Sequence, residues 1–179
     1  MLRPIGTDGV GDVHSPTPAA ESGPISTAAD ARLSAELTSV VAGARRRALR
    51  DGDRHIDTAH LLHSLLESDP GVRVLFSSGQ VARLLGYLVQ RSIGYGLQWQ
   101  GTVEDSGAVP LVRDQAGWSP AAAGAMEAAL VRADGRGARQ VGGVDLLVAL
   151  ARNAECRAVE VLGRAGVDPK ALIAAAATD

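Results

Sequence analysis

Residues 33–66, LSAELTSVVAGARRRALRDGDRHIDTAHLLHSLL, and residues 118–151, WSPAAAGAMEAALVRADGRGARQVGGVDLLVALA, follow one common pattern. A shift of 85 positions aligns them without a gap, and nine of the 34 aligned pairs are identical. The identical pairs are Ser34/Ser119, Ala44/Ala129, Arg47/Arg132, Ala48/Ala133, Gly52/Gly137, Arg54/Arg139, Leu61/Leu146, Leu62/Leu147 and Leu65/Leu150. After residue 66 the two repeats align again if the shift between them is increased by two positions. The sequence therefore predicts a tandem repeat.

Each repeat opens with a residue that suits a helix start. Ser34 and Ser119 can each accept a hydrogen bond from a first-turn amide, and Pro120 fits the first helical position because its missing donor is not needed there. The two helices that follow are rich in alanine and leucine. They are predicted to stop near Gly52 and near residues 135–137.

A second helix follows in each repeat. In the first repeat, either Asp57 or Thr58 is expected to cap this second helix. Leucines recur on one face of this helix in both repeats, and a short third and a fourth helix follow in each. Aromatic residues make up only 3% of the chain, which favours closely packed helices over a β-sandwich. The predicted fold class is all-α, with two tandem four-helix repeats.

Composition divides the rest of the chain. Residues 1–32 contain many prolines and glycines and little periodic apolar content, so they are expected to form a disordered tail. Residues 33–179 are expected to form the repeat domain. Its first repeat covers residues 33–91, a glycine-rich linker covers 92–117, and the second repeat covers 118–179.

Charge and motif content exclude several classes of function. A net charge of −2 and a pI near 6.1 argue against binding to nucleic acid or an anionic membrane, and the arginines from Arg45 to Arg50 are expected to be a solvated surface. The only lysine, Lys170, is not in a phosphate-binding loop, which excludes an ATPase. Neither a GxSxG motif nor an activated cysteine is evident, so no enzyme and no cofactor is expected.

The lone Cys156 cannot form an internal disulfide. We also find no transmembrane segment and no apolar stretch of a signal peptide. These features predict a cytoplasmic protein.

Three histidines, His55, His60 and His63, lie within nine positions and raise the question of a metal site. His60 and His63 share a helix face, but His55 precedes the helix, and zinc sites need three or four protein ligands. Their counterparts in the second repeat are Gln140, Asp145 and Val148. We therefore expect a helix start here and no metal.

The ordered pair of motifs resembles the N-terminal domain of Clp ATPases, which contains a double repeat. The matching stretches are LSAELTSVVAGARRRAL and IDTAHLLHSLL in the first repeat. Those in the second repeat are WSPAAAGAMEAAL, VGGVDLLVALA and AVEVLGRAGVDPKAL. The resemblance covers about residues 33–176 and implies an eight-helix domain with pseudo-twofold symmetry. In the family this domain docks adaptors and substrates ahead of ATPase modules.

The resemblance also implies a ligand site, an apolar groove between the two first helices that takes peptides and cyclic-peptide antibiotics. The matching positions here are Leu33, Ser34, Leu37, Trp118, Ser119, Met126 and Glu127. The alternative reading is that Trp118 packs against the start of its helix and Met126 belongs to the core.

Some family members bind phosphorylated arginine through a threonine at each first-helix cap and a glutamate in the second-helix segment. Ser34 and Ser119 match the threonines. Ala59 and Val144 occupy the glutamate positions, so neither repeat keeps the carboxylate that would pair with a guanidinium.

Three functions remain open. The first is a stand-alone module, without ATPase domains, that regulates or assists a Clp unfoldase and its protease by binding adaptors, substrates or degradation tags. The second is a sequestering protein that binds a small molecule or cyclic peptide in the groove and so protects the Clp ATPase. The third is a divergent interaction module whose tail is the binding element. The sequence gives no indication of the oligomeric state.

Overall fold

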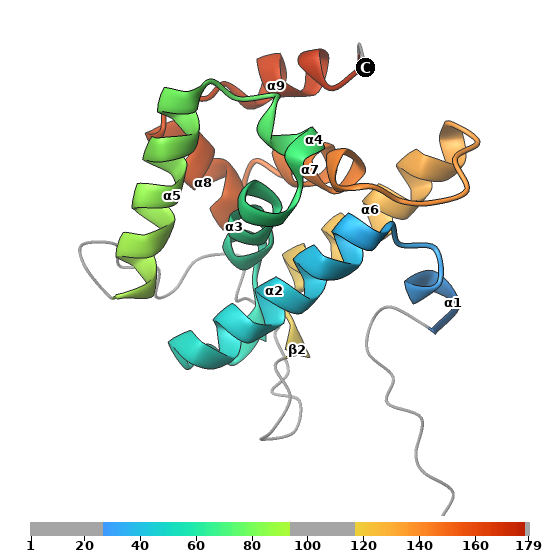
Figure 1. Cartoon of the computed structure of the whole chain (residues 1–179), viewed down its shortest axis with the longest axis horizontal. Coiled ribbons are helices and arrows are strands. Elements are labelled where there is room, and N and C mark those ends of the chain that lie inside the picture. Colours follow the sequence, from blue (N-terminus) through green and yellow to red (C-terminus); the bar gives the residue numbers. More distant parts are fainter. Residues whose placement is uncertain (1–26, 94–116, 178–179) are drawn as a thin grey trace, which may run out of the picture.

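The computed structural model describes residues 27–93 and 117–177. Within these two ranges the chain is helical, with two strands of only two residues each (Figure 1). The helices are α1 (Thr27–Asp30), α2 (Ala35–Asp51), α3 (Thr58–Ser68), α4 (Pro70–Arg73), α5 (Ser78–Ser92), α6 (Pro120–Gly135), α7 (Gly143–Arg152), α8 (Arg157–Arg164) and α9 (Pro169–Ala175). The all-α prediction is confirmed: α2–α5 and α6–α9 form the two sets of four helices.

The helix starts follow the capping residues that the sequence indicated. Ser34 Oγ accepts a hydrogen bond from the Leu37 N–H (3.1 Å), and Ser119 Oγ accepts one from the Ala122 N–H (3.1 Å). Asp57, rather than Thr58, caps α3. Helix α2 ends at Gly52, whose φ of 72° lies in the left-handed region that glycine adopts without strain.

The two repeats exchange short backbone pairings. Strand β1 (His55–Ile56) pairs in parallel with β2 (Gly117–Trp118), so that Ile56 faces Trp118. Leu33 forms a parallel bridge with Val141. Because Trp118 and Val141 are the repeat counterparts of Leu33 and Ile56, the second bridge is the first one with the repeats interchanged. The segment that precedes the first helix of each repeat therefore pairs with the other repeat.

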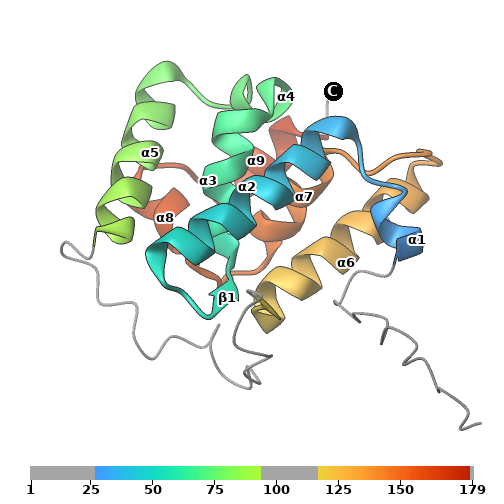
Figure 2. The same cartoon turned by 60° about the horizontal axis from the view of Figure 1, so that its bottom comes forward.

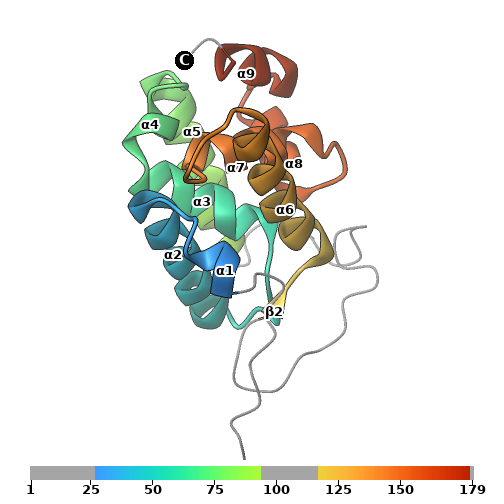
Figure 3. The ribbon, with the colours of Figure 1, turned by 90° about the vertical axis from the view of Figure 1, so that its right-hand side faces the viewer.

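The second helix of each repeat forms the centre of the domain. Nine of the eleven residues of α3 are buried, and so are eight of the ten residues of α7. The remaining helices pack around this pair, with the first-repeat helices beside those of the second repeat (Figure 3). The leucine stripe predicted for the second helices therefore forms the core, with Leu61, Leu62 and Leu65 fully buried beside Leu146, Leu147 and Leu150.

The repeats differ most in their last helix, because α5 has 15 residues and α9 has seven. Most of the predicted tail (1–26) and linker (94–116) lies outside the described residues. Residues 27–32, expected to belong to the tail, instead include helix α1, which lies beside α6 (Figure 2). An ion pair between Arg32 and Asp134 (2.5 Å) connects this segment to α6.

No helix in either described range is long and apolar enough to cross a membrane.

Candidate functional site

A cleft of about 530 Å³ opens where the first turns of α2, α4 and α7 come together. It is lined by Ser34, Glu36, Asp69, Pro70, Gly71, Arg136, Ala138, Gln140, Gly142, Gly143, Val144 and Asp145. Residues of both repeats therefore contribute, because α2 and α4 belong to the first repeat and α7 to the second. A volume of this size suits a single side chain, a short peptide segment or a small molecule.

Two glycines, Gly142 and Gly143, form the start of α7 beside the cleft. Asp69 caps α4 by accepting a hydrogen bond from the Val72 N–H (3.2 Å), and its carboxylate lies against the start of α7. A Cβ atom on Gly143 would stand 2.0 Å from Asp69 Oδ2 and 3.0 Å from Leu65 Cδ2. Gly142, the N-cap of α7, has no side chain to accept from the first-turn amides. Close approach of α4 to α7 thus depends on a residue without a side chain at 143.

The cleft has an acidic and a basic component. Asp145 is buried and accepts from Arg136 Nη2, which lies 2.7 Å from both of its carboxylate oxygens. Arg132 Nε lies 3.2 Å from the same carboxylate. Glu36 and Asp69 add two more carboxylates, so the lining combines three acidic side chains with Arg136.

The opposite face of the domain, at the start of α3, is closed by a buried ionic cluster. Asp57 Oδ2 accepts hydrogen bonds from Arg157 Nη1 (2.6 Å) at the start of α8 and from Arg91 Nη2 at the end of α5. The Thr58 hydroxyl accepts from the Ala158 N–H (3.1 Å). This cluster joins the two repeats, because α8 belongs to the second and α3 and α5 to the first.

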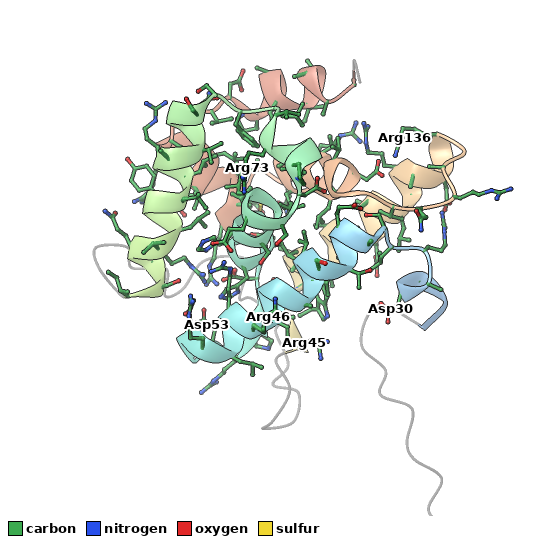
Figure 4. The ribbon with its side chains drawn as sticks, in the orientation of Figure 1. Asp30, Arg45, Arg46, Asp53, Arg73 and Arg136 are labelled. Atoms are coloured by element: carbon green, nitrogen blue, oxygen red, sulfur yellow. The ribbon has the colours of Figure 1, made fainter. Side chains whose placement is uncertain are left out.

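His60 belongs to this cluster and answers the question raised by the three histidines. Its Nε2 lies 3.0 Å from Asp53 Oδ2 and 4.0 Å from Asp51 Oδ2, an arrangement with the donor atoms of a metal site. Arg91, however, places Nη1 3.4 Å from the same Nε2 and Nη2 3.5 Å from Asp53. A guanidinium already supplies positive charge there, so the geometry does not favour a metal ion. The cluster and the cleft are separate sites: Figure 4 shows Asp53 of the cluster and Arg136 of the cleft toward opposite ends of α2.

The cluster changes the titration of its members. Burial alone would raise the pKa of Asp57, but its hydrogen bond with His60 and the charges of His60, Arg91 and Arg157 lower it far below its usual range. Burial would lower the pKa of His60, but hydrogen bonds to Asp53 and Asp57 outweigh it and raise that pKa. His60 Nδ1 lies 3.1 Å from the Asp57 amide nitrogen and 2.9 Å from Asp57 Oδ1. A neutral ring can accept from the amide, and a charged ring can donate to the carboxylate.

The residues of the predicted groove between the two first helices lie at different depths in the structure. Leu37, Ser119 and Met126 have no exposed surface, because the apolar stripes of α2 and α6 face the core. Leu33 is also buried, through its bridge to Val141. Ser34 and Trp118 are partly exposed, and Glu127 is exposed. The reading that Met126 belongs to the core is the correct one, and of the seven predicted residues only Ser34 lines the cleft.

The positions that the resemblance associated with phosphoarginine behave differently in the two repeats. Ser34 and Val144 both line the open cleft. Their counterparts Ser119 and Ala59 are both fully buried. One half of the domain thus presents this pair of positions on its surface, and the other half does not.

Sequence reasoning missed most of the cleft. Asp69, Arg136 and Asp145 are brought together by contacts between α4, α6 and α7 that no spacing along the chain indicates. The pair Gly142–Gly143 at the predicted start of a helix was a usable signal, because glycine there offers no cap and marks a close approach.

No protein-family model and no curated protein matches this sequence. Solved structures do match its fold. The N-terminal domain of the caseinolytic protease associated chaperone ClpD from Arabidopsis thaliana is 22% identical, with a TM-score of 0.62 over 83% of this chain and 94% of that one. The Hsp104 N-terminal domain from Candida albicans is 12% identical, with a TM-score of 0.63 over 80% and 88%.

A third structure, described as part of a malarial protein secretion system, is 17% identical, with a TM-score of 0.60 over 82% and 93%. The described residues therefore have the fold of Clp and Hsp104 N-terminal domains. The fold implied by the sequence resemblance is confirmed.

Proposed function

We propose that this chain is a protein-binding module of a Clp unfoldase system, which regulates or assists the unfoldase by docking a segment of an adaptor, a substrate or the ATPase itself. The fold shared with N-terminal domains of ClpD and Hsp104 supports this role. The observation that carries the proposal is the open cleft between α2, α4 and α7. Of the groove residues predicted from the sequence, Ser34 is retained because it lines this cleft.

The chemistry of the cleft suits a peptide. The first turn of α7 has no side-chain cap, and Glu36, Asp69 and Gln140 provide acceptor oxygens in the same lining. A peptide main chain carries one donor and one acceptor at almost every residue, so it can use both kinds of partner. Gly71 is exposed and Gly142 partly exposed, and without side chains they leave the backbone of the lining accessible to such a segment.

A sequestering role is the second candidate, and the cleft volume favours it. About 530 Å³ lies in the range of small-molecule sites, so a compact peptide-like molecule would fit the same place. Under this alternative the chain would bind that molecule and so keep it away from the Clp ATPase. It would have no protein partner.

Site-specific photocrosslinking in cells separates the two candidates. A photoreactive amino acid at position 144, which lines the cleft, is expected to crosslink to a Clp ATPase, an adaptor or a substrate. The same group at Val131, an exposed position on α6, serves as control. The charge reversal Glu36→Lys should abolish the crosslink, and Glu155→Lys on another exposed surface should not. Equal labelling from positions 144 and 131 would contradict docking in the cleft.

If position 144 captures no protein, the sequestering candidate takes precedence. Native mass spectrometry of the protein isolated from its cells would then show a bound small molecule that the Glu36→Lys variant lacks.

A further inference from the structure

The repeat symmetry defines a second position that corresponds to the open cleft. It maps Ser34 onto Ser119 and the start of α7, Gly142–Val144, onto the start of α3, Asp57–Ala59. With the two-residue slip, it maps Asp69 and Pro70 at the start of α4 onto Cys156 and Arg157 at the start of α8. Asp69 and Cys156 are indeed the N-cap residues of those two helices.

The counterpart position is filled by side chains of the chain itself. Arg157 is only 8% exposed, and its guanidinium is hydrogen-bonded to Asp57. Ser119, Thr58 and Ala59 have no exposed surface. In the open half, the residue in place of Arg157 is the exposed Pro70, and the residue in place of Asp57 is Gly142, which has no side chain to bind a guanidinium.

Arg91 also binds Asp57, but it enters from the end of α5. Helix α9 ends at Ala175, so no described residue of the second repeat takes the corresponding place. Arg157 is the first residue of α8, and its side chain binds Asp57. The corresponding first residue of α4 in the open half is Pro70. The exchange of Pro70 for Arg157 and of Gly142 for Asp57 is therefore the difference that brings a guanidinium and its carboxylate to the start of α3.

We propose that the side chain of Arg157 closes the second of two symmetry-related docking sites, so that the domain offers one site instead of two. This proposal rests on the proposed function for its meaning, because only a docking domain has sites to close. Its structural part stands alone: Arg157, by binding Asp57, excludes solvent and ligands from the start of α3. The domain is then a monovalent docking module built on a bivalent fold.

Thiol accessibility tests the closure without any partner, so its outcome is independent of the proposed function. Cys156→Ser removes the native thiol, and Val144→Cys and Ala59→Cys then place one thiol at symmetry-related positions of the open and the closed half. The probe is a water-soluble disulfide reagent such as DTNB. The thiol at 144 is expected to react at least about 100-fold faster than the thiol at 59, because reaction at a buried site requires local opening.

Arg157→Ala is expected to raise the rate at position 59 to within about 10-fold of that at position 144, because the closed site becomes open to solvent. Arg91→Ala is the matched control, since it removes the other arginine of Asp57 and is expected to leave position 59 protected. Arg157→Pro provides a second opening variant, because it copies Pro70 and proline suits the first position of a helix.

Circular dichroism establishes that each variant is folded before its thiol is measured. The proposal is overturned if position 59 already reacts like position 144 in the protein that retains Arg157. It is also overturned if position 59 stays protected in folded Arg157→Ala and Arg157→Pro variants, or if Arg91→Ala opens the site equally. Failure of both Arg157 variants to fold would show that Arg157 maintains the fold rather than closing a site, which likewise contradicts the proposal.

Discussion

The backbone of Ile56 pairs in parallel with that of Trp118, which joins the connection between α2 and α3 to the segment that precedes α6. The bridge between Leu33 and Val141 repeats this relationship with the two repeats interchanged. The Ser119 N–H donates to the Ile56 carbonyl (2.9 Å), and the Ser34 N–H donates to the Val141 carbonyl (2.9 Å). The start of each first helix is therefore positioned by the other repeat. This includes Ser34, which lines the cleft.

The exchanged pairings predict that neither repeat folds alone. Residues 27–93 or 117–179 in isolation would expose the buried faces of α3 or α7 and would lose the buried pair between Asp57 and Arg157. Far-ultraviolet circular dichroism should show low helicity and no cooperative thermal transition for either fragment, and a cooperative transition for the whole chain. A cooperative transition in one isolated fragment would contradict the account.

Gly143→Ala should destabilise the protein by about 1–3 kcal/mol, because the added methyl group would overlap the buried Asp69 carboxylate. Gly124→Ala is the control, since nothing lies within 4 Å of a Cβ atom at this helical position of α6. That change should stabilise the protein by up to about 1 kcal/mol through helix propensity. Urea unfolding measures both, and equal effects of the two substitutions would refute the close approach of α4 to α7.

Asp57→Asn should lower the free energy of unfolding by about 3–5 kcal/mol, because it leaves the charges of Arg91 and Arg157 buried without their carboxylate. Asp134→Asn removes the exposed partner of Arg32 and should have little measurable effect, since solvent screens that pair. Chemical denaturation of both variants provides the comparison. A small effect at Asp57 would mean that the cluster does not join the repeats.

The histidines predict opposite dependences on pH. Burial, and after it the charge of Arg47, lowers the pKa of His63 to about 4, against 6.5 in the unfolded chain, with Glu67, Arg50 and Asp51 as its other charged neighbours. The unfolded chain thus binds a proton that the fold excludes, and stability is lost as pH falls from 6.5 toward 4. His63→Gln should remove this loss in urea titrations at several pH values.

The pKa of His60 is raised, so its stabilising contribution is present below pH 6.5 and is lost as pH rises through the folded value. His60→Gln should accordingly remove a loss on the alkaline side, the opposite of His63→Gln. The same pH dependence in both variants would contradict the arrangement of charges around α3.

The features that the sequence predicted correctly are local or periodic. Capping by Ser34 and Ser119, the stop at Gly52 and the leucine stripes of α3 and α7 follow from residue spacing and backbone chemistry. The cleft depends on contacts between distant segments, such as Asp69 against Gly143, which no spacing reveals. The resemblance assigned Leu37 and Met126 to a ligand groove, whereas the structure buries both side chains in the core.

The location of the docking site is the central claim. It is tested most directly by hydrogen–deuterium exchange of the protein with and without the partner segment that the crosslinking identifies. We expect slower exchange at the first turns of α4 and α7, at the amides of residues 71–72 and 143–145, and no change at the first turn of α3, residues 58–60. Protection at residues 58–60, or exchange that does not change at 143–145, would show that the partner binds elsewhere on the domain.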